Sequence, residues 1–484
     1  MAYKREKIKG YITVYLALTL GILISFITTM LVGARIQTTR FQTECVMDIG
    51  LNSIFAEYHR EMLDQYGLLF IDSSYGKNVS VSSAKEAIKS HLLYYMNLNL
   101  DSNKNSLINK DITAAHADNA ILKDIAFASD ITGEVLRYQI DRYMKVKYGM
   151  NYLPSEKYNS DNLDNMLAEY DGYHHRRGAE KDRVDSLIDE YNSTLPEDEE
   201  PYSISNPADS VEDISGSNVL YYALGDKNDD FRIVDENDFI SHRAYINGSG
   251  LMAYQEKPDG LAHKFLLIDY IYDKCGYYGK LKPNSSLSYE IEYIIEGKGS
   301  DMENMERIAE KIFKIRYALN MSYLLSNSSK QSEAEALAIA ATSAIGLPEL
   351  TEAVKYTILF AWGYAESAKD LRILYDGHGL TATKNDSSWN TPLEQMIDFK
   401  AHLNEYSNPG GEMDYKAFLN LFLASCDTER ITMHLMDIME MDIRRTPGNS
   451  AFMMDRQVYQ LTADVNVSSG YGYDCSIKRF YSYE

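Results

Sequence analysis

Hydrophobic residues form an uncharged run near the start of the chain, over residues 11–32. At about 1.5 Å per residue, a helix of this length spans roughly 33 Å, enough to cross the hydrocarbon core of a bilayer. The alternative is a cleaved signal peptide, because Val32, Gly33 and Ala34 form a small-residue cleavage pattern. Signal peptides have a hydrophobic region of about 7–15 residues, and this run is longer. We therefore predict a retained transmembrane helix over residues 11–32.

Basic residues are distributed unequally on the two sides of this run. Four stand before it, namely Lys4, Arg5, Lys7 and Lys9. Only Arg35 and Arg40 follow it closely. Because basic residues are retained on the cytoplasmic side, residues 1–10 are predicted to be a cytoplasmic leader. The prediction is a single-pass protein of the cell membrane, with its N-terminus in the cytoplasm and its C-terminal portion outside.

A helical apolar stripe continues beyond the predicted membrane segment. Its members recur mainly at spacings of three and four residues, at Met47, Leu51, Ile54, Phe55, Tyr58 and Met62. No proline interrupts residues 11–66, and Gly67 stands where a left-handed helix end needs a residue without a Cβ. The pattern predicts one helix over residues 11–66 and a short strand over 68–71. Residues 33–72 are thus an extension of the anchor helix followed by a strand.

Residues 73–150 are predicted to form the first part of an extracytoplasmic α+β domain. A capping-box pattern from Ser83 to Glu86 predicts a helix that reaches about residue 97. Partial alternation predicts a strand over 110–117, and helical spacing predicts a helix over 131–147.

Residues 151–245 differ from their surroundings in charge. A charged helix is predicted over 164–191, and residues 197–238 hold 13 acidic side chains against two basic ones. Such a composition indicates an insertion or an exposed linker.

Residues 246–450 are predicted to form a helical domain. Helices are expected over 261–278, 300–325 (with a capping box at Ser300), 333–345 and 349–375, with one or two more in 415–445. A strand is expected over 289–295. Alternating segments 458–467 and 473–481 flank a Ser-Ser-Gly turn and predict a β-hairpin within residues 451–484. The predicted fold class is α+β and predominantly helical, with a long N-terminal transmembrane helix and a C-terminal β-hairpin.

Charge and cysteine content restrict the partners and the chemistry. The net charge is −23, and residues 1–40 contribute +5, so the remainder carries −23 − 5 = −28. Nucleic acids and anionic lipid surfaces require a basic footprint, which argues against both as partners. The cysteines at 45, 275, 426 and 475 form no Cys-x-x-Cys pair. Three disulfide pairings and free thiols all remain open.

The motif content predicts no catalytic residue, no cofactor, no metal ligand and no small-molecule substrate. The chain has no zinc-protease, nucleophile-elbow, phosphate-loop, dinucleotide or EF-hand pattern. The His-His-Arg-Arg run at 174–177 is interpreted as a solvated helix face, and Asp376 to Gly379 as a connecting loop. Trp362 is expected in the core, whereas Trp389 follows two serines in a predicted loop and is a candidate surface-binding residue. Gly21 and Ser25 have a small-xxx-small spacing and are candidates for packing against other transmembrane helices.

The segment from Lys9 to Leu18 resembles the N-terminus of minor pilins of the tight-adherence (Tad/Flp) branch of type IV pili. That resemblance implies cleavage by a prepilin peptidase between Gly10 and Tyr11, and makes residues 33–72 a pilin-like helix extension and strand. Tyr15 stands where such pilins usually place a glutamate that neutralises the new amino terminus of a neighbour. The resemblance therefore implies a low-copy accessory protein and not a main pilin.

Several further segments are similar to a clostridial-type Gram-positive membrane protein family of uncharacterised function that is associated with tight-adherence pilus loci. They lie at residues 33–35, 55–58, 66–70, 139–145, 293–297, 315–320 and 361–371. This similarity spans most of the chain. It implies partners among the membrane proteins of a pilus or secretion apparatus.

Two functions follow from these observations. The first is a membrane-anchored accessory or structural component of a Tad/Flp-type pilus or secretion apparatus, which acts through protein–protein contacts and is not an enzyme. The second is a membrane-tethered extracytoplasmic enzyme or ligand-binding protein for cell-wall polymers. Its carboxylates would be pairs such as Glu290 and Glu292, which share one face if residues 289–295 form a strand.

Overall fold

The structure is a computed structural model. It describes residues 10–77, 81–101, 113–149, 163–196, 200–201, 209, 217–227, 230–250, 260–344, 346–407 and 410–483. The predicted topology residues Lys4, Arg5, Lys7 and Lys9 lie outside these ranges. The chain divides into two compact units. Unit 1 consists of Met1–Gln139, Tyr245–Lys257 and Thr446–Glu484, and unit 2 consists of Ile140–Ala244 and Pro258–Arg445.

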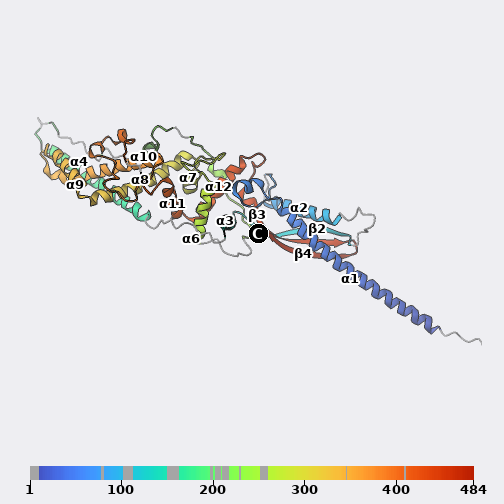
Figure 1. Cartoon of the computed structure of the whole chain (residues 1–484). Coiled ribbons are helices and arrows are strands. Elements are labelled where there is room, and N and C mark those ends of the chain that lie inside the picture. Colours follow the sequence, from blue (N-terminus) through green and yellow to red (C-terminus); the bar gives the residue numbers. More distant parts are fainter. Residues whose placement is uncertain are drawn as a thin grey trace, which may run out of the picture. The chain divides into compact units, whose positions relative to one another are not determined.

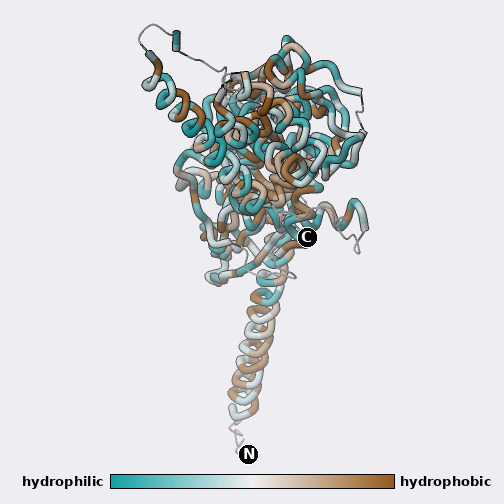
Figure 2. Tube along the Cα trace, turned by 90° about the vertical axis from the view of Figure 1, so that its left-hand side faces the viewer, coloured by the Kyte–Doolittle hydropathy of each residue, from teal (hydrophilic) through white to brown (hydrophobic). Residues whose placement is uncertain are grey.

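Helix α1 (Tyr11–Phe55) is the longest element of unit 1 (Figure 1). Its first half is exposed, and hydrophobic residues are spread over its turns (Figure 2). Its second half has a buried stripe at positions spaced by three and four residues, which includes Met47, Leu51 and Ile54. The uncharged run and the apolar stripe therefore belong to one continuous helix, as predicted, although its end differs.

The predicted continuation of this helix to residue 66 is wrong. The helix ends at Phe55, because the following residues pair with an extended segment: Tyr58 forms a bridge with Ile71, and the His59 amide donates to the Phe70 carbonyl at 2.8 Å. A short π-helix, η1 (Met62–Tyr66), follows. The prediction for Gly67 is confirmed, since it ends η1 in the left-handed conformation at φ 72°.

A four-stranded antiparallel sheet packs against α1. The strands are β1 (Ile71–Asp72), β2 (Ala115–Phe127), β3 (Gln457–Ser469) and β4 (Tyr473–Ser482). Strand β3 pairs with the other three, with Phe127 opposite Val458 and Ser482 opposite Gln460. The C-terminal hairpin is thus confirmed. The strands predicted over 68–71 and 110–117 are displaced along the chain to β1 and β2.

Helix α2 (Val81–Asp101) lies beside α1 and β2 and completes the core of unit 1. Alternate β3 residues, Leu461, Ala463 and Val465, enter this core together with Leu51 of α1 and Leu92 of α2. The capping box predicted at Ser83 is wrong, because the helix already begins at Val81. Residues 245–250 also belong to this unit: the Gly248 amide donates to Asp130 at 2.6 Å.

Unit 2 is helical in the residues that the structure describes, and four of its helices pack against α10 (Thr351–Tyr375). The other helices of unit 2 are α4 (Leu163–Ser193), α5 (Ser217–Leu224), α6 (Leu261–Lys274), α7 (Glu290–Glu296), α8 (Asp301–Ser326), α9 (Ser328–Ala344), α11 (Tyr415–Ser425) and α12 (Thr428–Arg444). Helix α3 (Asp130–Tyr148) crosses the boundary between the units. Helix α10 packs against α4, α5, α8 and α9, and every residue from 357 to 375 is buried.

Most helices of unit 2 confirm the predicted segments, but one element is of the wrong type. The segment predicted as a strand over residues 289–295 forms helix α7, which ends at Gly297 with φ 70°. Its apolar–acidic alternation is typical of a half-exposed strand. In the structure both glutamates are buried and bound by internal donors, so the alternation does not mark a solvent face. Helix α6 also ends earlier than predicted, at Lys274.

The second predicted capping box is correct in position and wrong in detail. Ser300 is the N-cap residue of α8, but its side chain makes no capping hydrogen bond. Asp301 instead accepts hydrogen bonds from the backbone amides of Arg232, Ser288 and Tyr289. These bonds fix the preceding loops against the start of α8.

The contact between α1 and α2 generates the first prediction. A Cβ at Gly50 would lie 3.1 Å from Met96 Cγ and 3.2 Å from Leu92 Cδ1. Gly50→Leu is therefore expected to lower the free energy of unfolding of unit 1 by about 1–3 kcal/mol, since overpacking a core costs this much. The measurement is urea-dependent pulse proteolysis of the full chain in mild detergent.

Gly33→Leu is the matched control, because Gly33 lies in the same helix and a Cβ at that position would have no neighbour within 4 Å. It is expected to leave the midpoint unchanged. An equal shift for both variants would contradict the close packing of α1 on α2.

Candidate functional site

The first candidate site is the exposed apolar half of α1. Over residues 11–32 only Thr19 is partly covered, and among the described residues α1 alone is long and apolar enough to cross a membrane. Gly10 and Tyr11, the predicted cleavage pair, are exposed at the N-terminal end of this helix. Length and composition thus make α1 a candidate transmembrane helix.

The threonine side chains within this half of α1 bond to the helix itself. Thr19 donates to the Tyr15 carbonyl at 3.0 Å, and Thr28 and Thr29 donate to carbonyls four residues earlier at 2.7 and 2.8 Å. A hydroxyl that is satisfied inside its own helix can enter lipid without losing a hydrogen bond to water. Gly21, one of the predicted packing residues, has open space around it, and Ser25 is exposed as well.

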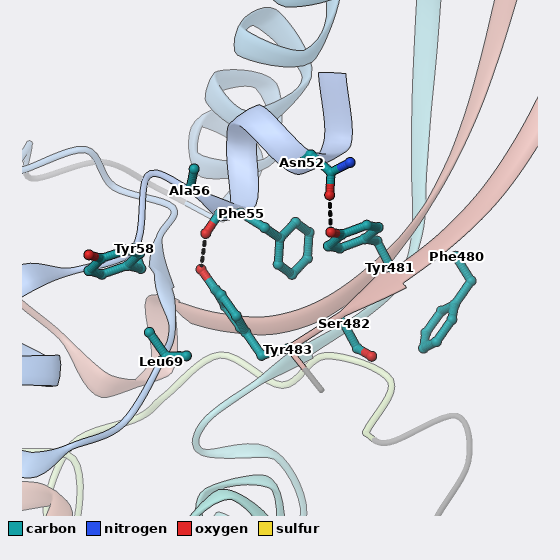
Figure 3. A pocket seen from close by; sticks show the side chains of 9 residues that line it. All are labelled: Asn52, Phe55, Ala56, Tyr58, Leu69, Phe480, Tyr481, Ser482 and Tyr483. Carbon is teal, nitrogen blue, oxygen red and sulfur yellow. Dashed lines mark hydrogen bonds between the residues drawn. The ribbon is translucent and has the colours of Figure 1, made fainter. Parts of the chain in front are cut away.

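The second candidate site is the seam between the end of α1 and the C-terminal strand. A pocket of about 610 Å³ opens here, lined by Asn52, Phe55, Ala56, Tyr58, Leu69, Phe480, Tyr481, Ser482 and Tyr483 (Figure 3). The Phe55 ring lies 4.6 Å from the Tyr481 ring and 4.9 Å from the Tyr483 ring, centroid to centroid.

Two hydrogen bonds reinforce this seam. The Tyr483 hydroxyl donates to the Phe55 carbonyl at 2.7 Å, and the Tyr481 hydroxyl donates to Asn52 (Figure 3). The last residues of the chain thereby hold the end of α1. The sequence places Tyr481 at the end of a predicted strand and Tyr483 just beyond it, and it does not identify their role, because their partners lie more than 400 residues away.

A polar pocket of about 520 Å³ adjoins the seam, and Tyr58 lines both. At its edge, the Glu57 carboxylate accepts hydrogen bonds from Tyr75 at 2.9 Å and from Tyr95 at 2.5 Å, and it lies 3.2 Å from His91 Nδ1. These contacts satisfy Glu57 where the chain leaves helical geometry after α1. They tie the segment that follows α1 to Tyr75 and to His91 and Tyr95 of α2.

The third candidate site is a cluster of buried charges in unit 2, made of Arg316, Glu366, Asp370 and Lys384, which we call the α10 ionic cluster. All four side chains are at most 1% exposed. Lys384 Nζ lies 2.5 Å from Glu366 Oε1 and 2.7 Å from Asp370 Oδ1, and Arg316 Nε donates to Asp370 Oδ2 at 2.9 Å. Burial alone would raise the pKa of Asp370, but Arg316 and Lys384 outweigh it and hold that pKa below its usual value.

Trp389 stands beside this cluster and is only half-buried. Its ring lies 5.5 Å from the Trp362 ring and 5.4 Å from the Tyr323 ring, and Lys384 Nζ lies 5.9 Å from its centroid. The expected core position of Trp362 is confirmed, since that side chain is fully buried. Trp389 therefore forms a wall of the buried cluster as well as a partly exposed surface.

Glu290 and Glu292, the carboxylates named for the enzyme hypothesis, do not share a face. Glu290 accepts from the Gly276 amide at 2.6 Å and pairs with Lys282 at 3.4 Å. Glu292 accepts from the Tyr278 amide and the Tyr415 hydroxyl, both at 2.9 Å. Glu290 and Glu292 are two residues apart on a helix, so their side chains are rotated by about 200° from each other about the helix axis. The predicted pairing of these carboxylates is wrong, because the segment is a helix.

Thiols and metal ligands complete the set of candidate groups. All four cysteines are free, so the structure contains none of the three disulfide pairings. Within the described ranges, no group of three or more His, Cys, Asp or Glu side chains is arranged to hold a metal ion.

The fold and these sites define an α+β, predominantly helical protein with one candidate N-terminal transmembrane helix. The chain belongs to a family of unknown function (DUF5702), whose model matches residues 197–469, more than half of the sequence. The matched region includes α5 to α12 and ends at the last residue of β3. No curated protein and no solved structure matches the sequence.

Burial of Glu292 generates a pH prediction. Its carboxyl is fully buried, and desolvation raises its pKa from 4.5 to about 7. The folded protein therefore keeps a proton that the unfolded chain loses above pH 4.5, so stability falls as the pH rises from 4.5 to 7. The amide side chain of Glu292→Gln is uncharged at every pH. The free energy of unfolding of this variant at pH 8 is therefore expected to exceed that of the wild type by up to about 3 kcal/mol.

The measurement is urea unfolding between pH 5 and pH 8, followed by tryptophan fluorescence. Both tryptophans of the chain, Trp362 and Trp389, lie in unit 2, so the signal reports this unit alone. Glu352→Gln, on an exposed position of α10, is the control and should follow the wild-type pH profile. If the free energies of unfolding of Glu292→Gln and the wild type differ by the same amount at all pH values, the raised pKa of Glu292 is contradicted.

Proposed function

We propose that the protein is a membrane-anchored accessory or structural component of a Tad/Flp-type pilus or secretion apparatus. In this proposal residues 11–32 span the cell membrane, the N-terminus is cytoplasmic, and both units lie outside. Partners in the same membrane contact the anchor, and Gly21 and Ser25 provide the surface for close helix approach.

The observation that carries the proposal is the division of α1 into two halves with different environments. One half is uncharged, exposed and internally hydrogen-bonded, and the other half carries the core stripe of unit 1. The resemblance of the N-terminal segment to minor pilins implies the same division, with a helix that anchors in lipid and also supports the folded part. A continuous helix transmits the position of the membrane anchor directly to the sheet.

The arrangement of charge further supports a role in protein contacts. The chain beyond residue 40 carries a net charge of −28, which disfavours binding to anionic lipid surfaces. Tyrosines are abundant, with 39 in the chain, and tyrosine supplies amphipathic contact area at protein interfaces. Glu290 and Glu292, on which the cell-wall enzyme alternative rests, are engaged by internal donors, so no observation favours that alternative.

The test of this function is to extract the full-length protein from native membranes in mild detergent and to identify the proteins that co-purify. We expect the assembly ATPase, polytopic platform protein or pilin subunits of a tight-adherence locus. A Gly21→Leu, Ser25→Leu double variant should lose membrane partners selectively. Recovery of the protein without any such component, from membranes that contain the apparatus, would contradict the proposal.

Membrane insertion of α1 gives a separate prediction. The apolar side chains of residues 11–32 favour insertion by on the order of 5 kcal/mol, and each arginine at the helix centre costs about 2.5–3.5 kcal/mol. Leu23→Arg combined with Phe26→Arg is therefore expected to move most of the protein into the soluble fraction or into degradation. The measurement is alkaline carbonate extraction of membranes followed by immunoblotting.

Leu281→Arg is the matched control, since Leu281 is as exposed as Leu23, at 63% against 56%, and lies in unit 2. It should leave the protein in the membrane pellet. Retention of the double variant in the pellet would show that α1 is not the anchor.

A further inference from the structure

The α10 ionic cluster contains the groups that an amide-forming reaction requires. A lysine amine touches two carboxylates, and all of these side chains are withdrawn from water. Other lysine–aspartate pairs of unit 2 are as short but open to solvent: Lys227 and Asp376 are 2.7 Å apart, with 43% and 22% of their side chains exposed. What distinguishes Lys384 is the combination of contact, burial and a second carboxylate.

The two carboxylates of the cluster have different surroundings, which assigns them different roles. Asp370 Oδ1 faces Lys384, while Asp370 Oδ2 accepts hydrogen bonds from Arg316 Nε at 2.9 Å and from Asn320 Nδ2 at 3.0 Å. Two donors on one oxygen stabilise the negative charge that develops when a nucleophile adds to the carboxyl carbon. Asp370 is thus arranged as the acceptor of the amine.

Glu366 is arranged as the proton carrier. Its Oε1 is 2.5 Å from Lys384 Nζ, and its carboxylate is held in place by the Asn390 amide at 3.0 and 3.2 Å. A carboxylate within hydrogen-bond reach of an ammonium can remove its proton and return it to a leaving group. The rings of Trp389 and Trp362 form an apolar wall beside this arrangement.

We propose that Lys384 and Asp370 are joined by an intramolecular amide bond that the α10 ionic cluster forms autocatalytically. Glu366 passes one proton from the Lys384 ammonium to Asp370 Oδ1, and the free amine then adds to Cγ of the resulting neutral carboxylic acid. Arg316 and Asn320 stabilise the negative charge that develops on Asp370 Oδ2 after this addition. The Cγ–Oδ1 bond then breaks, and Oδ1 leaves as water with the proton that Glu366 passed to it and a second proton from the nitrogen.

The reaction balances in atoms and charge. An ammonium and a carboxylate become a neutral amide and one water molecule, with no oxidant or cofactor, and Glu366 returns to its carboxylate form. Arg316 and Glu366 remain as opposite charges. The bond removes two of four buried charges, and isolated buried charges are costly. It ties α10 to the loop that follows it, 14 residues further along the chain.

The test is mass spectrometry of the full-length protein purified from membranes and denatured. Relative to a Lys384→Arg variant made in parallel, the wild type should be lighter by one water molecule after correction for the substitution, and processing at the N-terminus cancels in this comparison. In a tryptic digest, cleavage after Lys384 should be lost, giving a branched peptide in which residues 370–372 are attached to residues 373–400. Cleavage after Lys227, the solvent-exposed counterpart, should be complete.

Three results decide the proposal. A wild-type chain of full mass, with normal cleavage after Lys384, overturns it. A branched peptide that carries residues 356–369 overturns the assignment to Asp370, because that peptide contains Glu366. The Glu366→Gln variant should retain the full mass, and its tryptophan fluorescence should show that unit 2 is folded. Formation of the amide bond at the wild-type rate in this variant overturns the role of Glu366. None of these measurements depends on the proposed pilus function.

Discussion

The packing of the second half of α1 against a sheet built from distant parts of the chain is the constraint on which unit 1 depends. Met47, Leu51 and Ile54 enter a core with alternate residues of β3, and β3 is the only described strand that pairs with all the others. Because β3 begins at Gln457 and β2 ends at Phe127, the sheet cannot close until segments separated by more than 300 residues meet. Contacts of such sequence separation form late, since the loop entropy must be lost before they stabilise anything.

The helical unit meets a different constraint, which is the cost of placing charges in its interior. Helix α10 is buried on all sides from residue 357 to 375, yet it contains Glu366, Lys369, Asp370 and Arg372. Each of these finds partners: Arg372 donates to the carbonyls of Tyr221 and Tyr222, and the acidic pair meets Arg316 and Lys384. Buried ionic groups of this kind specify one arrangement of the surrounding helices, because any other arrangement leaves a charge unpaired.

The C-terminal end of α1 meets β4 and Tyr483 at the seam where α1 stops. Glu57 satisfies its carboxylate with Tyr75 and Tyr95, and Tyr483 caps the Phe55 carbonyl, so the helix end is fixed by side chains from three separate segments. In the proposed role as a membrane-anchored component, this rigidity has a direct consequence. The orientation of the exposed, uncharged half of α1 is set by the folded sheet and not by a flexible linker.

Features that depend on local pattern could be predicted from the amino-acid sequence alone. An uncharged run, a stripe at helical spacing and a pair of alternating segments are properties of neighbouring residues, and they identify the candidate anchor, most helices and the C-terminal hairpin. Features that depend on distant partners emerge only in the folded chain: the end of α1 at Phe55, the helical state of residues 290–296, and the meeting of Lys384 with Glu366 and Asp370. In each case a polar group has its partner in another segment of the chain. The spacing of hydrophobic residues along the sequence carries no information about such a contact.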